Sequence, residues 1–230
     1  MKQLISPRRT SGVILASAIG ALALAFTPAA SAATNIAFNN DAEFSFTGPA
    51  VVGDSGDTWF QFTTVDAGPI LVGDGISVTV SGSDGAFYGG DSLTGFEPIT
   101  KDEIYSGGTL TITLSGLVIS QSYNITGIAS VDNYFDEGGD GGNTKTFTAT
   151  GTNTVSNTLF NNSSVDTFQD GVNYRTLAGV QPTAGGVITL TLKTDVSLNA
   201  LQIVAVPEPT SVLLGLVGVG MIGSLRRRKA

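Results

Sequence analysis

The sequence predicts an all-β domain, an antiparallel β-sandwich, with an apolar helical segment at each terminus. Two observations predict this class. Short runs alternate apolar and polar residues with a period of two, as where Leu110, Ile112 and Leu114 alternate with threonines, and a strand turns every second side chain to one face. Clusters of glycine and proline separate these runs and mark turns. We therefore expect about ten strands in two packed sheets.

Further strand candidates repeat this alternation along the chain. Ile188, Leu190 and Leu192 alternate with polar residues, so one face of that strand is buried and the other meets water. No exact internal repeat is visible, and a β-helix or a propeller is therefore not favoured. The other candidates contain Phe44, Phe46, Phe60, Phe62, Ile76, Val78, Val80, Tyr123, Ile125, Phe147, Tyr174, Leu201 and Ile203.

The N-terminal segment has the three parts of a secretory signal peptide. Basic residues precede an uncharged run at 12–26, and small residues follow it,. We expect residues 1–32 to be removed by cleavage before Ala33, with Ala30 and Ala32 as the small residues that the signal peptidase reads,. A membrane anchor is the alternative, but the run is shorter than the roughly 20 residues that span a bilayer.

The C-terminal segment has a motif, an apolar run at 212–225 and a basic end, in that order. A helix of this length rises about 21 Å, less than the roughly 30 Å of hydrocarbon, so it can halt in a membrane without forming a comfortable permanent span. Terminal cations would hold that end on the cytoplasmic side. The motif residues are Pro207, Glu208 and Pro209, and the basic residues are Arg226, Arg227, Arg228 and Lys229.

This order of elements resembles the PEP-CTERM sorting signal of Gram-negative bacteria. The resemblance implies recognition by an exosortase, a membrane-embedded cysteine protease that would remove the tail and pass the protein to the outer surface or the extracellular matrix. It implies Pro207, Glu208 and Pro209 as recognition residues, and Arg226 to Arg228 as the stop signal. The alternative is a simple tail anchor with an accidental Pro-Glu-Pro sequence.

Composition excludes several classes of function. The chain contains no cysteine and no histidine, which removes disulfides, thiol nucleophiles, and every catalytic triad with an imidazole base. Residues 33–206 contain 18 acidic and four basic residues, a net charge of −14. A surface this acidic repels phosphate groups, so we do not expect nucleic acid as a partner.

Several segments between the termini resemble galactose-binding-like and malectin-like domains. These segments are 51–59, 110–117, 122–125, 173–175 and 198–204. The resemblance implies a jelly-roll-type sandwich over residues 33–206, with 198–204 as its closing strand. In the group that the chain resembles, asparagine usually follows the tryptophan that matches Trp59, whereas Phe60 follows it here.

The loop at 132–143 is rich in side-chain oxygens and glycine. Ca²⁺ prefers oxygen ligands of this kind, and the loop is therefore a candidate Ca²⁺ site. Its spacing matches neither an EF-hand nor a Ca²⁺-binding β-roll, and a solvated acidic turn is the alternative. The candidate ligands are Asp132, Asp136, Glu137, Asp140 and Asn143.

Carboxylate pairs are the only acid–base groups left for catalysis. Asp102 and Glu103 are neighbours, as are Asp136 and Glu137. Because adjacent strand residues point to opposite faces, such a doublet does not flank a bond at the roughly 5 to 9 Å that glycoside hydrolysis requires. A carboxylate pair across two strands stays open. We expect a protein that is not an enzyme, with a polysaccharide-acting glycoside hydrolase as the alternative.

Carbohydrate binding requires aromatic side chains in an accessible groove. Tyr88 and Tyr134 lie in glycine-rich loops and are the ligand-binding candidates,. Trp59 and Tyr174 lie within strand patterns, where packing is the expected role. We expect Arg175, one of four cations in this region, to pair with a neighbouring acid,.

Together these observations predict three parts: a signal peptide at 1–32, a β-sandwich at 33–206 and a sorting segment at 207–230. The predicted function is that of an exported, non-catalytic protein of the cell surface or extracellular matrix, inserted transiently in the inner membrane through its C-terminal helix. The predicted partners are an exosortase-type protease and an exopolysaccharide. A Ca²⁺-dependent adhesin is the second alternative, after a glycoside hydrolase.

Overall fold

The computed structural model describes residues 33–38, 46–53, 57–62, 68–73, 75–87, 95–129, 144–160, 167–193 and 196–206. The chain divides into two compact units, Met1–Ala30 and Ser31–Ala230, and every described residue belongs to the second. Strands account for 58% of the described residues and helix for 3%, which confirms the all-β class. Within these ranges fourteen strands form three sheets, more than the sequence predicts, because several of them have only two or three residues.

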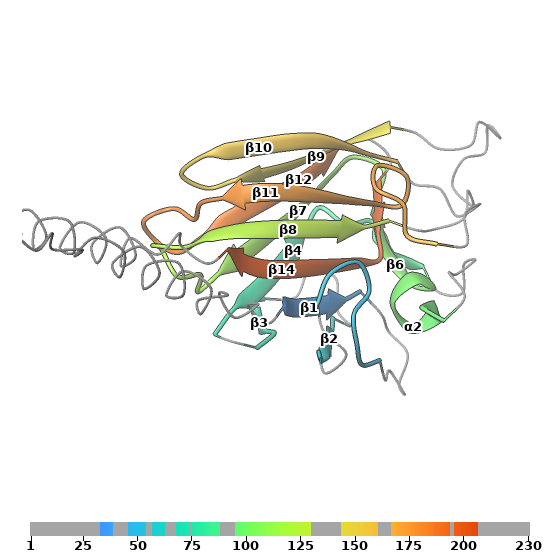
Figure 1. The fold of residues 1–230 in the computed structure, drawn as a ribbon. Coiled ribbons are helices and arrows are strands. Elements are labelled where there is room, and N and C mark those ends of the chain that lie inside the picture. The colour runs from blue at the N-terminus through green and yellow to red at the C-terminus, as the bar shows by residue number, and fades with distance from the viewer. Residues whose placement is uncertain are drawn as a thin grey trace, which may run out of the picture. The chain divides into compact units, whose positions relative to one another are not determined.

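The first sheet has five strands in the order β11-β8-β14-β1-β2 (Figure 1). All neighbours are antiparallel except β1 and β2, which run parallel. A parallel pair needs a crossover. Of the segment that connects these two strands, residues 46–53 are described and lie over the outer face of the sheet, bound to Gln202. Its strands are β1 (Ala33–Ala37), β2 (Trp59–Gln61), β8 (Ser122–Ile128), β11 (Tyr174–Val180) and β14 (Ala200–Val206).

The second sheet has six antiparallel strands in the order β10-β9-β12-β7-β4-β3. The alternation predicted at 109–114 and 188–192 is confirmed, because Leu110, Ile112 and Leu114 are fully buried, as are Ile188, Leu190 and Leu192. Its strands are β3 (Ile70–Leu71), β4 (Ser77–Ser81), β7 (Thr109–Ser115), β9 (Thr144–Thr150), β10 (Thr154–Phe160) and β12 (Ile188–Lys193).

The two large sheets pack face to face around one hydrophobic core. Ile125, Leu201 and Ile203 of the first sheet belong to the same buried cluster as Ile112 and Leu190 of the second. The arrangement is therefore a two-layer β-sandwich. Burial of this apolar area supplies the main stabilisation, in a chain that has no cysteine for disulfides.

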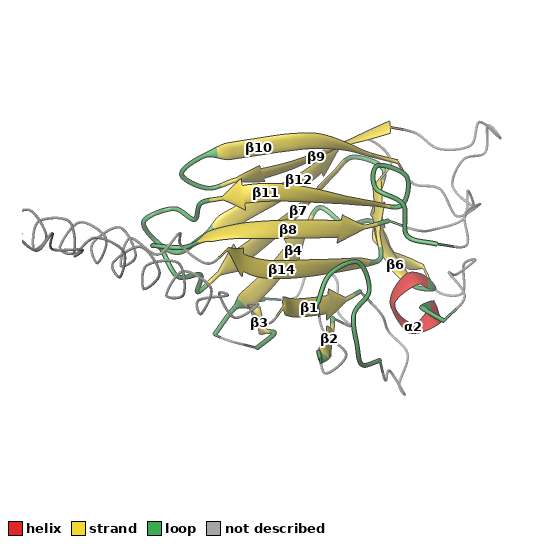
Figure 2. Cartoon of the chain, in the orientation of Figure 1, coloured by secondary structure: helices red, strands yellow, loops and turns green. Residues whose placement is uncertain are grey.

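A small third sheet and one short helix close one end of the sandwich. The sheet has the order β13-β6-β5, with β5 (Gly85–Phe87), β6 (Glu103–Ser106) and β13 (Val196–Leu198). The helix α2 (Glu97–Thr100) precedes β6 and lies beside it (Figure 2). We call this the far end of the sandwich.

The opposite end is where β14 finishes at Val206, and we call it the tail end. It contains the β7–β8 loop at 116–121 and the β11–β12 loop at 181–187, together with the start of β1 (Figure 1). The two ends have different chemistry, and candidate sites lie at each of them.

Candidate functional site

At the tail end, the last strand, β14, stays paired with the sheet up to Val206, the last described residue. Val204 pairs with Ala33 on one side and with Asn124 on the other, but Ala205 and Val206 pair only with Tyr123 and Ser122 of β8. Backbone pairing therefore holds the chain to the sheet as far as Val206.

The two loops beside this exit contain no charged residue and are tied together. The Leu117 N–H donates to the Gly186 carbonyl at 3.0 Å, and the Val118 N–H donates to the Tyr123 hydroxyl at 2.9 Å. Gly186 has a φ of 71°, and a Cβ there would lie 2.6 Å from the Leu117 carbonyl oxygen, so the contact requires glycine,. These bonds fix the backbone beneath two exposed apolar side chains, Val118 and Ile119.

At the far end, β6 places a carboxylate in the protein interior. Glu103 is 1% exposed, and the Ser197 side chain and the Lys145 ammonium lie near its carboxylate. Burial raises its pKa to about 7, while Ser197 and the Lys145 ammonium partly offset the rise,. Glu103 is therefore a group that exchanges a proton near neutral pH inside the fold.

The neighbouring acid, Asp102, does not complete a catalytic pair. It is also 1% exposed, and its backbone carbonyl accepts a hydrogen bond of 2.8 Å from the Asn199 side chain. Asn199 also donates to the Thr100 carbonyl at 2.9 Å, so it fastens α2 and β6 to the start of β14. A general acid must reach its substrate, and both carboxylates of this doublet are buried.

The outer face of the first sheet carries a buried polar network under segment 46–53. The Gln202 Oε1 accepts hydrogen bonds from the N–H groups of Val51 and Val52 at 3.0 and 3.1 Å. Its Nε2 donates to the Val52 carbonyl at 2.7 Å and to the Asn35 Oδ1 at 2.8 Å. Gln202 and Asn35 are fully buried, so the network holds the crossover segment against the sheet.

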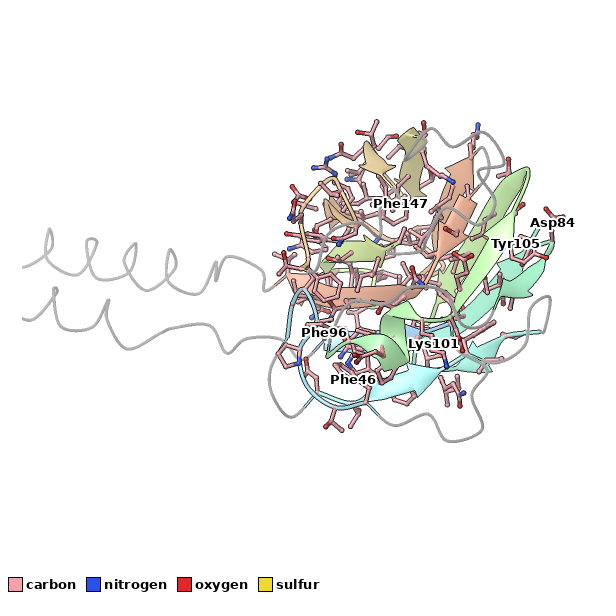
Figure 3. The ribbon with its side chains drawn as sticks, turned by 90° about the vertical axis from the view of Figure 1, so that its right-hand side faces the viewer. Phe46, Asp84, Phe96, Lys101, Tyr105 and Phe147 are labelled. Carbon is pink, nitrogen blue, oxygen red and sulfur yellow. The ribbon has the colours of Figure 1, made fainter. Side chains whose placement is uncertain are left out.

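Aromatic side chains cover the rest of this outer face. Phe96 contacts Phe46 with ring centroids 6.0 Å apart and Phe168 with centroids 4.8 Å apart. Phe46 in turn packs on Trp59, and Phe168 packs on Tyr174. Figure 3 views the far end and labels Phe46 and Phe96, together with Lys101 at the C-terminal end of α2. The rings therefore pack against one another.

Three expectations from the sequence are confirmed in this region. Trp59 is 7% exposed and its Nε1 donates to the Gly48 carbonyl at 2.9 Å, a packing role. Tyr174 is half-buried and belongs to the same apolar cluster. Arg175 pairs with a nearby acid, Asp170, at 3.0 Å.

Most predicted site residues lie outside the described residues. Ala33 is the exception: it begins β1 and pairs with Val204. The strands that flank the predicted Ca²⁺ loop, β8 and β9, have their adjoining ends at the far end of the sandwich (Figure 1). The residues outside the described set are Ala30, Ala32, Tyr88, Asp132, Tyr134, Asp136, Glu137, Asp140, Asn143, Pro207, Glu208, Pro209, Arg226, Arg227 and Arg228.

Two properties of the described residues bear on the predicted sites. Among them, no three acidic side chains form a group that could hold a metal ion. Within the same part of the chain, no helix is long and apolar enough to cross a membrane. Both the loop at 132–143 and the apolar run at 212–225 lie outside that part.

Sequence reasoning missed two features. It considered Glu103 only as half of a carboxylate doublet and did not predict its burial, which no local pattern in the sequence signals. It also passed over Val118 and Ile119, two apolar residues in a turn between alternating strands. An apolar pair in such a turn is the signal that could have identified them.

Comparison with known families identifies the segment that leaves the tail end. Residues 205–229 match the model of the PEP-CTERM protein-sorting motif. The chain carries an exosortase sorting signal. This PEP-CTERM motif indicates export and sorting to the cell surface of a Gram-negative bacterium, with processing by exosortase, a membrane enzyme. No curated protein and no solved structure matches the chain.

The PEP-CTERM motif begins inside the fold. Its first two residues, Ala205 and Val206, are the last two of β14 and are hydrogen-bonded to β8. The sorting signal and the sandwich are therefore continuous.

Proposed function

We propose that the chain is a non-catalytic component of the bacterial cell surface or exopolysaccharide matrix, with the sandwich as the exported cargo and residues 207–230 as its sorting segment. One observation carries the proposal: the sorting motif starts within the closing strand of the sandwich. A protease that acts on this motif handles the folded domain at the same time.

The described carboxylates support a non-catalytic role. Asp102 and Glu103 are buried, and Asp170 is engaged by Arg175. The charge of −14 between residues 33 and 206 keeps a surface protein soluble and favours contact with neutral sugars or cations over anionic polymers.

The proposal includes a galactose-binding-like jelly roll with carbohydrate contact through Tyr88 and Tyr134. In its support, the segment that resembles the closing strand of that group, 198–204, supplies β14, which pairs antiparallel with β1 and with β8. Its polar residues Asn199 and Gln202 hold neighbouring segments against the sheet.

The sorting role is tested by replacing the motif in the full-length protein in its own host. The variant Pro207→Ala, Glu208→Ala, Pro209→Ala should stay in the inner membrane with its tail, whereas the wild type reaches the surface without it. The matched control is Glu97→Ala, which changes the exposed Glu-Pro pair of α2 and should be sorted normally. Equal surface levels and equal masses for both variants would refute the proposal.

The carbohydrate part has a separate test. Purified exopolysaccharides from the same host should bind the wild type, and Tyr88→Ala with Tyr134→Ala should weaken binding. Thr109→Ala, an exposed change at the far end, should leave binding unchanged. No binding across the panel would remove the carbohydrate contact and leave the sorting role untouched.

A further inference from the structure

We propose that the tail end of the sandwich rests on the lipid bilayer, with Val118 and Ile119 in contact with the lipid, while the C-terminal segment is inserted in the membrane. The inference rests on the proposed sorting function, because it requires the inserted tail. It adds an orientation: the far end points away from the membrane.

The first observation is the exposure of apolar side chains at this end. Ile119 is 64% exposed and Val118 is 52% exposed, and Leu71, on the strand β3 toward the same end, is 67% exposed. These are the large hydrophobic side chains that the described part of the protein exposes. Exposed apolar residues that gather at one place mark a contact surface.

The second observation is their distance from the membrane segment. Val206 pairs with Ser122, and Ile119 is three residues before Ser122, so Ile119 lies within about 16 Å of the point where the chain leaves the fold. The apolar run begins at Val212, and six residues reach at most about 21 Å. The inserted tail therefore keeps the apolar loop close to the bilayer surface.

The third observation is the distribution of charge. Of the charged side chains that the structure describes, Asp57 alone lies toward the tail end, where its carboxylate is next to Gly53 and near Ala33. The loops at 116–121 and 181–187 contain no charged residue. Phospholipid surfaces in bacteria are anionic and repel acidic groups, so these loops approach them without that repulsion. The described charged residues at the far end are Asp84, Glu97, Lys101, Asp102, Glu103, Lys145, Asp170, Arg175 and Lys193.

The occupant that these observations favour is lipid rather than a second copy of the chain. The tail brings a bilayer to this end in every molecule, whereas a second copy must be recruited. Val118 and Ile119 sit on a loop fixed by backbone hydrogen bonds, which suits shallow insertion of two apolar side chains into the interface.

The test uses the absence of cysteine from the chain. Ile119→Cys and, as a matched control, Thr109→Cys are made in the full-length protein and labelled with an environment-sensitive fluorophore. Thr109 is exposed and starts β7 at the far end, while Ile119 follows the other end of the same strand. Val118→Cys is the second variant should Ile119→Cys fail to fold.

The labelled proteins are reconstituted in vesicles of phosphatidylethanolamine and phosphatidylglycerol, and flotation reports insertion of the tail. We expect the label at 119 to shift to the blue, to be quenched by a lipid-borne quencher and to be protected from iodide. The label at 109 should stay accessible to iodide. Protein that floats with both labels equally accessible to iodide would overturn the inference and leave the sorting function standing.

Two other outcomes would also overturn the proposed lipid contact. Protein that does not float would show that the tail does not insert. The lipid contact would then fail together with the proposed sorting function on which it rests. A shift of the label at 119 without vesicles, growing with protein concentration, would show that a second copy covers the loop and would overturn the lipid contact.

Discussion

The two ends of the sandwich are built by different physical means. At the tail end, short loops are held by backbone hydrogen bonds and by glycines with positive φ, and the described charged groups are almost absent. At the far end, the third sheet holds the buried carboxylate of Glu103, whose pKa is raised to about 7 by burial. Glycines with positive φ occur at both ends, as Gly82 shows beside the Thr109 carbonyl at the far end. The difference is that the far end adds titratable and charged groups, so its stability also depends on pH and salt.

The largest expected effect comes from a glycine of the tail end. Gly116 has a φ of 84°, and a Cβ there would collide with the Gly75 carbonyl oxygen. Gly116→Ala should therefore lower the free energy of unfolding by roughly 3–5 kcal/mol, through strain and steric clash. In a thermal melt this corresponds to a fall in Tm of about 10 °C.

Gly108→Ala provides the matched control on the same strand. Gly108 precedes β7 at the far end, has no positive φ, and the nearest atom to a Cβ there is the Ser106 Oγ at 3.9 Å. We expect a change within about 1 kcal/mol. Equal losses of stability in the two variants would contradict the view that the tail end depends on glycine geometry.

The second prediction concerns Glu103 and the pH. Its pKa is about 7 in the folded protein, against 4.5 for the ordinary side chain. The folded state therefore holds the proton more tightly, and the stability from this group is full below pH 4.5, decreases as the pH rises, and is lost above pH 7. The total loss is on the order of 3 kcal/mol.

Glu103→Gln should remove this dependence, because glutamine does not ionise. At pH 8 the variant should be more stable than the wild type, and the difference should vanish toward pH 4.5, as measured by urea denaturation across this range. The control is Glu97→Gln at an exposed site. Backbone hydrogen bonds lower the pKa of this carboxyl, so the pH dependence of stability that it contributes lies in the range below pH 4.5. Parallel pH profiles for wild type and Glu103→Gln would contradict the prediction.

The sequence predicted the parts of the fold that depend on local alternation. The strands β7 and β12 were predicted because every second residue is apolar over six positions, and this pattern needs no knowledge of the neighbours. The third sheet, the helix α2 and the parallel pairing of β1 with β2 were not predicted. They arise from contacts between segments far apart in the chain, such as Asn199 with Thr100, which no local pattern contains.

The candidate sites follow the same division. The sorting motif was identified from a linear order of residues, and the family comparison bears it out. The burial of Glu103 could not be derived, because it depends on β13 and β9 meeting β6, as Ser197 and Lys145 do near its carboxylate. Alternation places one of two adjacent acids outward, yet Asp102 and Glu103 are both buried because covering elements reach both of them.

The smallest effect is expected at the ion pair of the far end. The Arg175 guanidinium and the Asp170 carboxylate lie 3.0 Å apart with side chains 21% and 54% exposed, so solvent screens most of their attraction, and Asp170→Asn should cost about 0.5 kcal/mol. The loss should shrink further in high salt, while the bond from the Arg175 Nε to the Thr158 carbonyl stays in place. Melts at low and high NaCl measure both effects. A loss that does not change with salt would show that Asp170 acts through packing or hydrogen bonding instead of charge, and the contrast between the two ends would then rest on Glu103 alone.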